Sequence, residues 1–210
     1  MKKLLGVFFA ILLLPVCAQA VPITIAISGN VTSASGSGLP GTIHAGVSFT
    51  GTYTYDSNTP DSDTSPIWGV YQHNSPYGIS IAIGGYEFKT ASNHVGQFKI
   101  RITNDDPVNG PKDYYTVFSD ENVVIPSAGL TIDYIKWGLS DSTYTAFSSD
   151  TLPVTAPVLT DWNYNVLDIH GFDSLGHGLY IYGTVTQAVI PEPLTVSLMM
   201  MGILFFKRRR

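Results

Sequence analysis

The strongest constraint on the fold is an apolar spacing of two that recurs from Val21 to about Ala188. Successive side chains of a β-strand point to opposite faces of a sheet, so this spacing is typical of strands with one buried and one solvated face. Apolar residues alternate with threonine, serine and alanine at 23–28 and again at 47–55. A helical spacing of three and four is almost absent between these ends. The sequence therefore predicts one all-β domain over residues 21–188.

Two places in this pattern predict a specific backbone geometry. The apolar run 79–83 meets Gly84-Gly85 and continues on the other side of the two glycines. Two glycines supply the positive φ angles of a tight primed turn, which predicts a β-hairpin. At Tyr134-Ile135 the alternation changes phase, and a β-bulge is the usual cause of such a change.

Further strands are expected wherever the alternation recurs. The positions that share one face of each strand are Phe98/Ile100/Ile102, Tyr114/Thr116/Phe118, Leu130/Ile132/Tyr134, Tyr164/Val166/Asp168 with Leu167/Ile169 on the opposite face, and Leu179/Ile181 with Val185. Stretches rich in Pro, Gly, Asn and Asp separate the strands at 56–66, 104–113 and 148–157. About eight to ten short strands with such separators predict an antiparallel β-sandwich or jelly roll, with a closed barrel as the alternative.

The first twenty residues have the three parts of a secretory signal peptide. Two lysines precede an apolar stretch at 4–14, and the small residues Ala18 and Ala20 form an A-x-A site before Val21. The apolar stretch is about half the length of a membrane-spanning helix, which favours cleavage over anchoring. We therefore expect export through the Sec translocon and removal of residues 1–20 by signal peptidase.

Charge and cysteine content exclude several classes of function. Cys17 is the only cysteine and lies in the predicted signal peptide, so the mature chain has no thiol and no disulfide. Between residues 21 and 190, fifteen acids face five cations, which gives a net charge near −10. Such a body repels phosphate backbones, and we expect no binding to nucleic acid.

The C-terminal segment 189–210 has three distinct parts. Pro191 and Pro193 flank Glu192, and because proline lacks an amide hydrogen and restricts the residue before it, this triplet is expected to be extended and exposed. Residues 194–206 form an apolar run that would cover about 20 Å as a helix, short for a membrane span but tolerable if the bilayer thins. The basic end is expected to stay cytoplasmic as a stop-transfer signal. It consists of Lys207, Arg208, Arg209 and Arg210.

The order of these parts resembles the PEP-CTERM sorting signal of Gram-negative bacteria. The resemblance implies an inner-membrane intermediate, recognition by exosortase at Pro191, Glu192 and Pro193, and a final location at the cell surface or in the extracellular matrix, linked to exopolysaccharide and biofilm. Without the Pro-Glu-Pro triplet, the apolar run and the basic end would indicate only a C-terminal membrane anchor with a stop-transfer signal. The body also looks like exported β domains of that family at 49–62, 104–117 and 148–159, and this second likeness brings no assigned activity.

Metal-binding and catalytic patterns are sparse. Asp56, Asn58, Asp61 and Asp63 lie within eight residues and are weak candidates for a calcium site, although they do not fit the EF-hand pattern. The chain contains no G-x-S-x-G elbow, Walker loop, dinucleotide-binding glycine motif or H-E-x-x-H sequence. The histidines match no zinc motif and are expected to be polar loop residues. They are His44, His73, His94, His170 and His177.

Aromatic residues leave two interpretations open. Trp68, Trp137 and Trp162, together with twelve tyrosines, could be core or cross-strand pairs, or could form a platform on which sugars stack. We therefore expect a non-catalytic exported protein that needs no cofactor. The alternative is a carbohydrate-binding β-sandwich module, with or without calcium. A glycosidase remains a third hypothesis, because two suitably spaced carboxylates are all that it requires.

Overall fold

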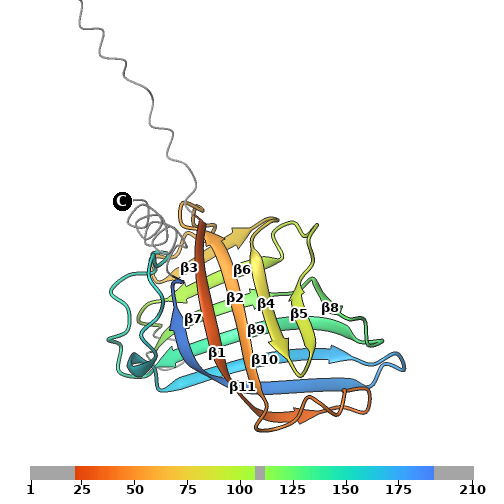
Figure 1. Cartoon of the computed structure of the whole chain (residues 1–210). Coiled ribbons are helices and arrows are strands. Elements are labelled where there is room, and N and C mark those ends of the chain that lie inside the picture. The colour runs from red at the N-terminus through yellow and green to blue at the C-terminus, as the bar shows by residue number, and fades with distance from the viewer. Residues whose placement is uncertain (1–21, 107–111, 192–210) are drawn as a thin grey trace, which may run out of the picture.

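The computed structural model describes residues 22–106 and 112–191 of the chain. These residues form eleven β-strands and one short 3-10 helix (Figure 1). The strands are β1 (Pro22–Ser35), β2 (Ser48–Asp56), β3 (Trp68–His73), β4 (Gly78–Ile83), β5 (Tyr86–Thr90), β6 (Phe98–Thr103), β7 (Asp113–Ser119), β8 (Asn122–Ile125), β9 (Thr131–Asp141), β10 (Tyr164–Phe172) and β11 (Gly178–Val189). The helix η1 covers Leu159–Asp161.

All of these strands belong to one antiparallel sheet, in the order β3-β6-β7-β9-β10-β11-β1-β2-β4-β5-β8. The sheet curls on itself, so that β1, β2, β4, β5 and β8 form a front layer over a back layer of β3, β6, β7, β9, β10 and β11 (Figure 1). The predicted all-β, antiparallel class is confirmed. The layers are two halves of one hydrogen-bonded sheet, and the sheet stays open because β3 and β8 are its edges.

The two layers are joined where β1 pairs with β11. This pairing contains two register shifts, one between Ser28 and Gly29 and one between Val31 and Ser33. Such irregularities bend a strand and increase its twist. Gly29 and Gly183 leave room beside them for the Phe49 ring, which would lie 2.7 Å and 2.8 Å from a Cβ atom at these positions. The bend therefore depends on the absence of side chains at two positions.

Large aromatic side chains fill the space between the layers. Tyr53 of β2 and Tyr115 of β7 are buried, and their hydroxyl groups share a hydrogen bond of 3.0 Å across the core. Both rings lie edge-on to Trp137 of β9, with centroids at 5.8 Å and 6.1 Å. The Trp137 indole donates to Asn165 Oδ1 at 3.0 Å, so this buried donor is satisfied. Burial raises the pKa of Tyr53 well above its ordinary value, which keeps the hydroxyl neutral.

Both predicted backbone features occur. Gly84 and Gly85 connect β4 to β5 with φ angles of 58° and 90°, as a primed turn requires. In the β9–β10 pair, His170 lies opposite Tyr134 whereas Gly171 lies opposite Ile132. Asp133 is thus the extra residue of a bulge, one position before the predicted site, and it shifts the buried face of β9 from Ile132 to Ile135 and Trp137.

The sequence pattern missed two strands and reversed the faces of another. β3 and β8 are the sheet edges, and their four to six residues carry too little alternation to be recognised. In β7 the expected positions Tyr114, Thr116 and Phe118 are only partly buried, whereas Asp113, Tyr115, Val117 and Ser119 face the core. Aromatic residues on both faces of β7 had hidden its inner side.

The chain leaves the sheet just before the triplet that was expected to be extended. β11 ends at Val189, and Ile190 and Pro191 are exposed. Residues 22–106 and 112–191 contain no helix long and apolar enough to span a membrane. The predicted signal peptide with Ala18 and Ala20, the residues Glu192 and Pro193, the predicted apolar helix 194–206 and the basic end all lie outside the described residues.

We expect Gly29→Ala to destabilise the domain by about 1–3 kcal/mol, because its new methyl group would overlap the Thr184 carbonyl oxygen and crowd Phe49. Chemical denaturation followed by tryptophan fluorescence measures the effect. Gly41→Ala is the matched control, since no atom of the described residues lies within 4 Å of a Cβ at Gly41. Equal stability of the two variants would mean that the β1–β11 bend does not need the glycine.

Candidate functional site

The three tryptophans do not form a common surface. Trp137 is fully buried in the core and Trp162 is 9% exposed, packed against Phe147 with ring centroids 5.2 Å apart. Trp68, on the edge strand β3, is 39% exposed. A stacking platform built from these three tryptophans is therefore wrong, and the core interpretation holds for two of them.

A different set of aromatic residues gathers on the outer surface of the back layer. These residues alternate with the buried positions of β7, β9, β10 and β11, so their rings point away from the core. We call this set the aromatic face. It consists of Phe118, Tyr134, His170, Phe172, Tyr180 and Tyr182.

Ring contacts link all six residues of the aromatic face. His170 lies at the centre, with its ring centroid 5.3 Å from Tyr134, 5.0 Å from Phe172 and 4.7 Å from Tyr180. Tyr180 and Tyr182 stack at 6.4 Å, and Phe118 stacks on Tyr134 at 5.9 Å. Phe172, Tyr180 and Tyr182 are each between 37% and 39% exposed, so their rings are available to a ligand.

Strand register places five of the six residues, all except Phe172, in two adjacent rows. Tyr134, His170 and Tyr180 are cross-strand neighbours on β9, β10 and β11. The second row runs across five strands. Its members, from β6 to β11, are Lys99, Phe118, Lys136, Asp168 and Tyr182. One row thus supplies ring faces, and the other adds charged groups capable of hydrogen bonding.

Hydrogen bonds fix the polar groups of the aromatic face. The Tyr134 hydroxyl donates to Asp168 Oδ2 at 3.0 Å, and His170 Nδ1 lies 3.0 Å from Asp133 Oδ2. Burial and the hydrogen bond to Asp168 raise the pKa of Tyr134. Burial and the negative charge of Asp168 raise the pKa of Tyr182. Both hydroxyl groups therefore stay protonated and remain hydrogen-bond donors at neutral pH.

Three of the five cations between residues 21 and 190 border or lie on this face. The Arg101 guanidinium lies 5.6 Å and the Lys99 ammonium 6.0 Å from the centroid of the Phe118 ring, within the range of cation–π attraction. Lys99 also pairs with Asp120 at 3.2 Å. Lys136 is the third cation, beside Asp168 in the second row.

The outer surface of the front layer has a different character. A shallow hollow of about 510 Å³ lies there, lined by small side chains of β1, β2 and β4 and by residues of β5 and β11. Its lining includes Ala26, Ser28, Thr50, Thr52 and Ala82, together with Glu87 and Gln187. The two outer surfaces of the same curled sheet are therefore unequal, and the aromatic residues concentrate on the back layer.

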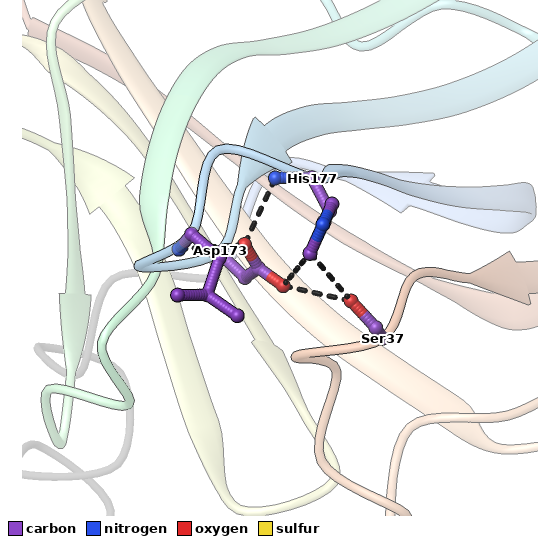
Figure 2. A network of polar contacts seen from close by, with 4 residues as sticks. Ser37, Asp173 and His177 are labelled. Carbon is purple, nitrogen blue, oxygen red and sulfur yellow. Dashed lines mark hydrogen bonds and ion pairs between the residues drawn. The ribbon is translucent and has the colours of Figure 1, made fainter.

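Ser37, Asp173 and His177 come together at the turn between β10 and β11 and resemble a catalytic triad by residue type (Figure 2). Asp173 Oδ2 accepts the Ser37 hydroxyl at 2.7 Å and lies 3.0 Å from His177 Nδ1. Asp173 Oδ1 accepts the backbone amides of Leu175 and His177, both at 2.9 Å. These donors hold the pKa of Asp173 well below its usual range.

This geometry is that of a capped turn. A catalytic histidine holds the serine with one ring nitrogen and the acid with the other. Here the same nitrogen, His177 Nδ1, lies next to both Asp173 and Ser37, the latter at 3.3 Å, and the serine hydroxyl already donates to the carboxylate. The cluster ties the β10–β11 turn to the segment after β1.

The carboxylates considered for calcium are engaged separately by backbone amides. Asp56 Oδ1 accepts the amide of Asn58, Asp63 Oδ1 accepts that of Ser65, and Asp61 Oδ1 accepts those of Asp63 and Val70. In the part of the chain that the structure describes, no three His, Cys, Asp or Glu residues form a metal-binding group. Asp61 covers the edge strand β3 by bonding the Val70 amide.

Two buried acids lie opposite each other at the end of the β7–β9 pair. They are Asp113 and Asp141. The first belongs to an acidic turn that the sequence offers as a further calcium candidate, and the second is a residue that sequence reasoning missed. Asp113 accepts the amides of Asp105 and Phe147, at 3.0 Å and 2.8 Å. Burial acts to raise the pKa of Asp141, but amide and hydroxyl donors outweigh it and lower that pKa. The general acid of a glycosidase needs a raised pKa, so Asp141 is better suited to anchoring its loop.

The histidines do not share the expected loop environment. His44 and His177 are exposed loop residues, whereas His170 belongs to β10 and His73 to β3. His73 and His94 are almost completely buried, and His73 Nδ1 lies 3.0 Å from the Thr59 hydroxyl. Within the described part of the chain, His73 Nε2 and His94 Nδ1 have no hydrogen-bond partner.

Comparison with known proteins does not identify a relative of this chain. No protein-family model, no curated protein and no solved structure matches it. The residues themselves are therefore the only basis for the function proposed below.

Burial lowers the pKa of His73 from 6.5 to about 4, with Asp56 opposing and His94 assisting. Below pH 6.5, His73 is protonated in the unfolded chain but stays neutral in the folded protein, so the free energy of unfolding falls as the pH decreases. We expect His73 to account for a loss of about 2 kcal/mol between pH 7.5 and 5, measured by denaturation at each pH. His73→Phe should flatten this dependence and His44→Gln should not; parallel profiles for wild type and His73→Phe would contradict the assignment.

Proposed function

We propose that this chain is a non-catalytic exported protein of the cell surface or extracellular matrix. Residues 1–20 direct it to the Sec translocon and signal peptidase. The apolar run 194–206 and the basic residues after it hold the chain in the inner membrane until exosortase processes it at Pro191, Glu192 and Pro193. The support comes from the order of these parts in the sequence and from the exit of the chain at Val189, after which Ile190 and Pro191 are exposed.

We expect Pro191→Ala combined with Pro193→Ala to leave unprocessed protein in the inner membrane, because the backbone would lose the extended shape that a protease cleft requires. Cell fractionation and mass spectrometry of the mature C-terminus report the outcome. Pro60→Ala with Pro66→Ala is the matched control, since both prolines are exposed in a loop of the domain. Surface material from wild-type cells that still ends at Arg210 would contradict processing.

A second proposed function is carbohydrate binding by the β domain, and the observation that favours it is the aromatic face. Aromatic rings offer flat apolar surfaces that suit the apolar faces of sugars, and neighbouring hydroxyl, carboxylate and amine groups can bond the sugar hydroxyls. Exposed rings and such polar groups occur together in the two rows that contain His170 and Asp168. The proposal assigns no role to calcium. Carbohydrate binding complements the proposed sorting, because a surface-exposed domain that binds exopolysaccharide would be retained in the matrix.

We expect the purified full-length protein to be retained on at least one polysaccharide, equally with calcium and with a chelator. Tyr180→Ala with Tyr182→Ala should weaken retention at least tenfold, on the expectation that each ring contributes about 1 kcal/mol. Trp68→Ala, which removes a similarly exposed ring outside the aromatic face, should leave retention unchanged. Absence of retention on every polysaccharide tested would reject carbohydrate binding and leave the sorting proposal intact.

A further inference from the structure

We infer that the ligand of the aromatic face is an uncharged polysaccharide chain that lies across strands β6 to β11, and this inference rests on the proposed carbohydrate binding. Three properties of the face carry it: its length, its charge balance and its unused hydrogen-bonding capacity. The length and the charge balance each exclude a class of ligand, and the third property offers a partner to a sugar hydroxyl.

The length of the face favours a polymer over a single sugar. The row that starts at Lys99 and ends at Tyr182 crosses five neighbouring strands. Adjacent strands lie about 4.8 Å apart, so the row extends for about 19 Å. Its groups stand on the outer side of a sheet whose inner side is the core. A ligand that used the whole row would have to be extended and would run perpendicular to the strands.

The charges on the face favour a ligand without net charge. The cations Lys99, Arg101 and Lys136 are matched by Asp120, Asp133 and Asp168, and Lys99 is already paired with Asp120 at 3.2 Å. The body as a whole is near −10, which disfavours an acidic polymer such as a polyuronate. A cationic polymer would meet Arg101 and Lys136 on the face itself. Balanced ionic groups suit hydroxyl groups, which both donate and accept hydrogen bonds.

Asp168 gives the face an acceptor that the protein leaves unused. Its Oδ2 atom accepts the Tyr134 hydroxyl, while its Oδ1 atom is buried and has no hydrogen-bond partner among residues 22–106 and 112–191. A buried carboxylate oxygen without a donor is costly. This oxygen is covered in the free protein, so a sugar hydroxyl reaches it only when a neighbouring side chain moves aside, and the new hydrogen bond would then relieve that cost. Asp168 lies between Lys136 and Tyr182 in the second row, so this acceptor is flanked by a cation and a ring.

Affinity electrophoresis of the full-length protein in detergent tests the inference, with soluble hydroxyethylcellulose and dextran as neutral polymers and alginate as the acidic one. We expect retardation by a neutral polymer, a loss of at least tenfold in affinity for Tyr180→Ala with Tyr182→Ala and for Asp168→Ala, and little retardation by alginate. Thr52→Ala, on the outer surface of the front layer, is the control and should bind as the wild type does.

Contrary outcomes separate this inference from the function on which it rests. Stronger retardation by alginate, abolished by Arg101→Ala with Lys136→Ala, would overturn the uncharged ligand and keep carbohydrate binding. Binding to neutral polymers that survives both Asp168→Ala and the double tyrosine variant would move the site away from the aromatic face. A dimer in analytical ultracentrifugation that the double tyrosine variant abolishes, without retardation by any polymer, would assign the face to a second copy of the chain.

Discussion

The pairing of β1 with β11 is the constraint on which the rest of the structure depends. It is the only connection in the strand order between the front and back layers among the described residues, so its geometry decides whether the sheet closes over its apolar side. Two register shifts bend it, and two glycines admit the Phe49 ring at the bend. With the layers folded together, Tyr53 and Tyr115 meet across the core and Trp137 packs on both. A straight β1 would leave these rings in water.

The same bend explains how the outer side of the back layer is free for the binding proposed above. The inner residues of β9, β10 and β11 pack in the core, and backbone pairing between the strands holds the outward-facing residues in register. These outward-facing residues contribute to the fold mainly through cross-strand contacts. Tyr134, His170 and Tyr180 are therefore fixed relative to one another before a ligand arrives. A preorganised surface avoids much of the entropy loss that ordering flexible side chains would add to binding.

Local patterns in the sequence predicted the strands well and their partners hardly at all. The β4–β5 hairpin and the β9 bulge follow from neighbouring residues, because Gly84-Gly85 and the phase change at Tyr134-Ile135 leave direct marks on the alternation. The aromatic face depends on which strands lie side by side. Tyr134, His170 and Tyr180 are far apart in the chain and meet only through the β9–β10–β11 register. Nothing in the sequence around His170 indicates that it lies between two strands that carry tyrosines. The tryptophans were the more obvious candidates for a stacking surface, but two of the three belong to the core.

The position of the termini connects the proposed sorting to the proposed binding. β1 begins at Pro22, and its residue Ala26 pairs with Val189 at the end of β11, so the described chain enters and leaves the domain at the same end. Tyr182 precedes Val189 on the same strand by seven residues, which is at most about 23 Å along the backbone because both register shifts of the β1–β11 pair lie between them. In the proposed anchored state, a tail held in the inner membrane after Pro191 would therefore have this part of β11 between it and Tyr182. The face would be open to a polymer while the protein is anchored, and release at the triplet would leave the binding surface unchanged.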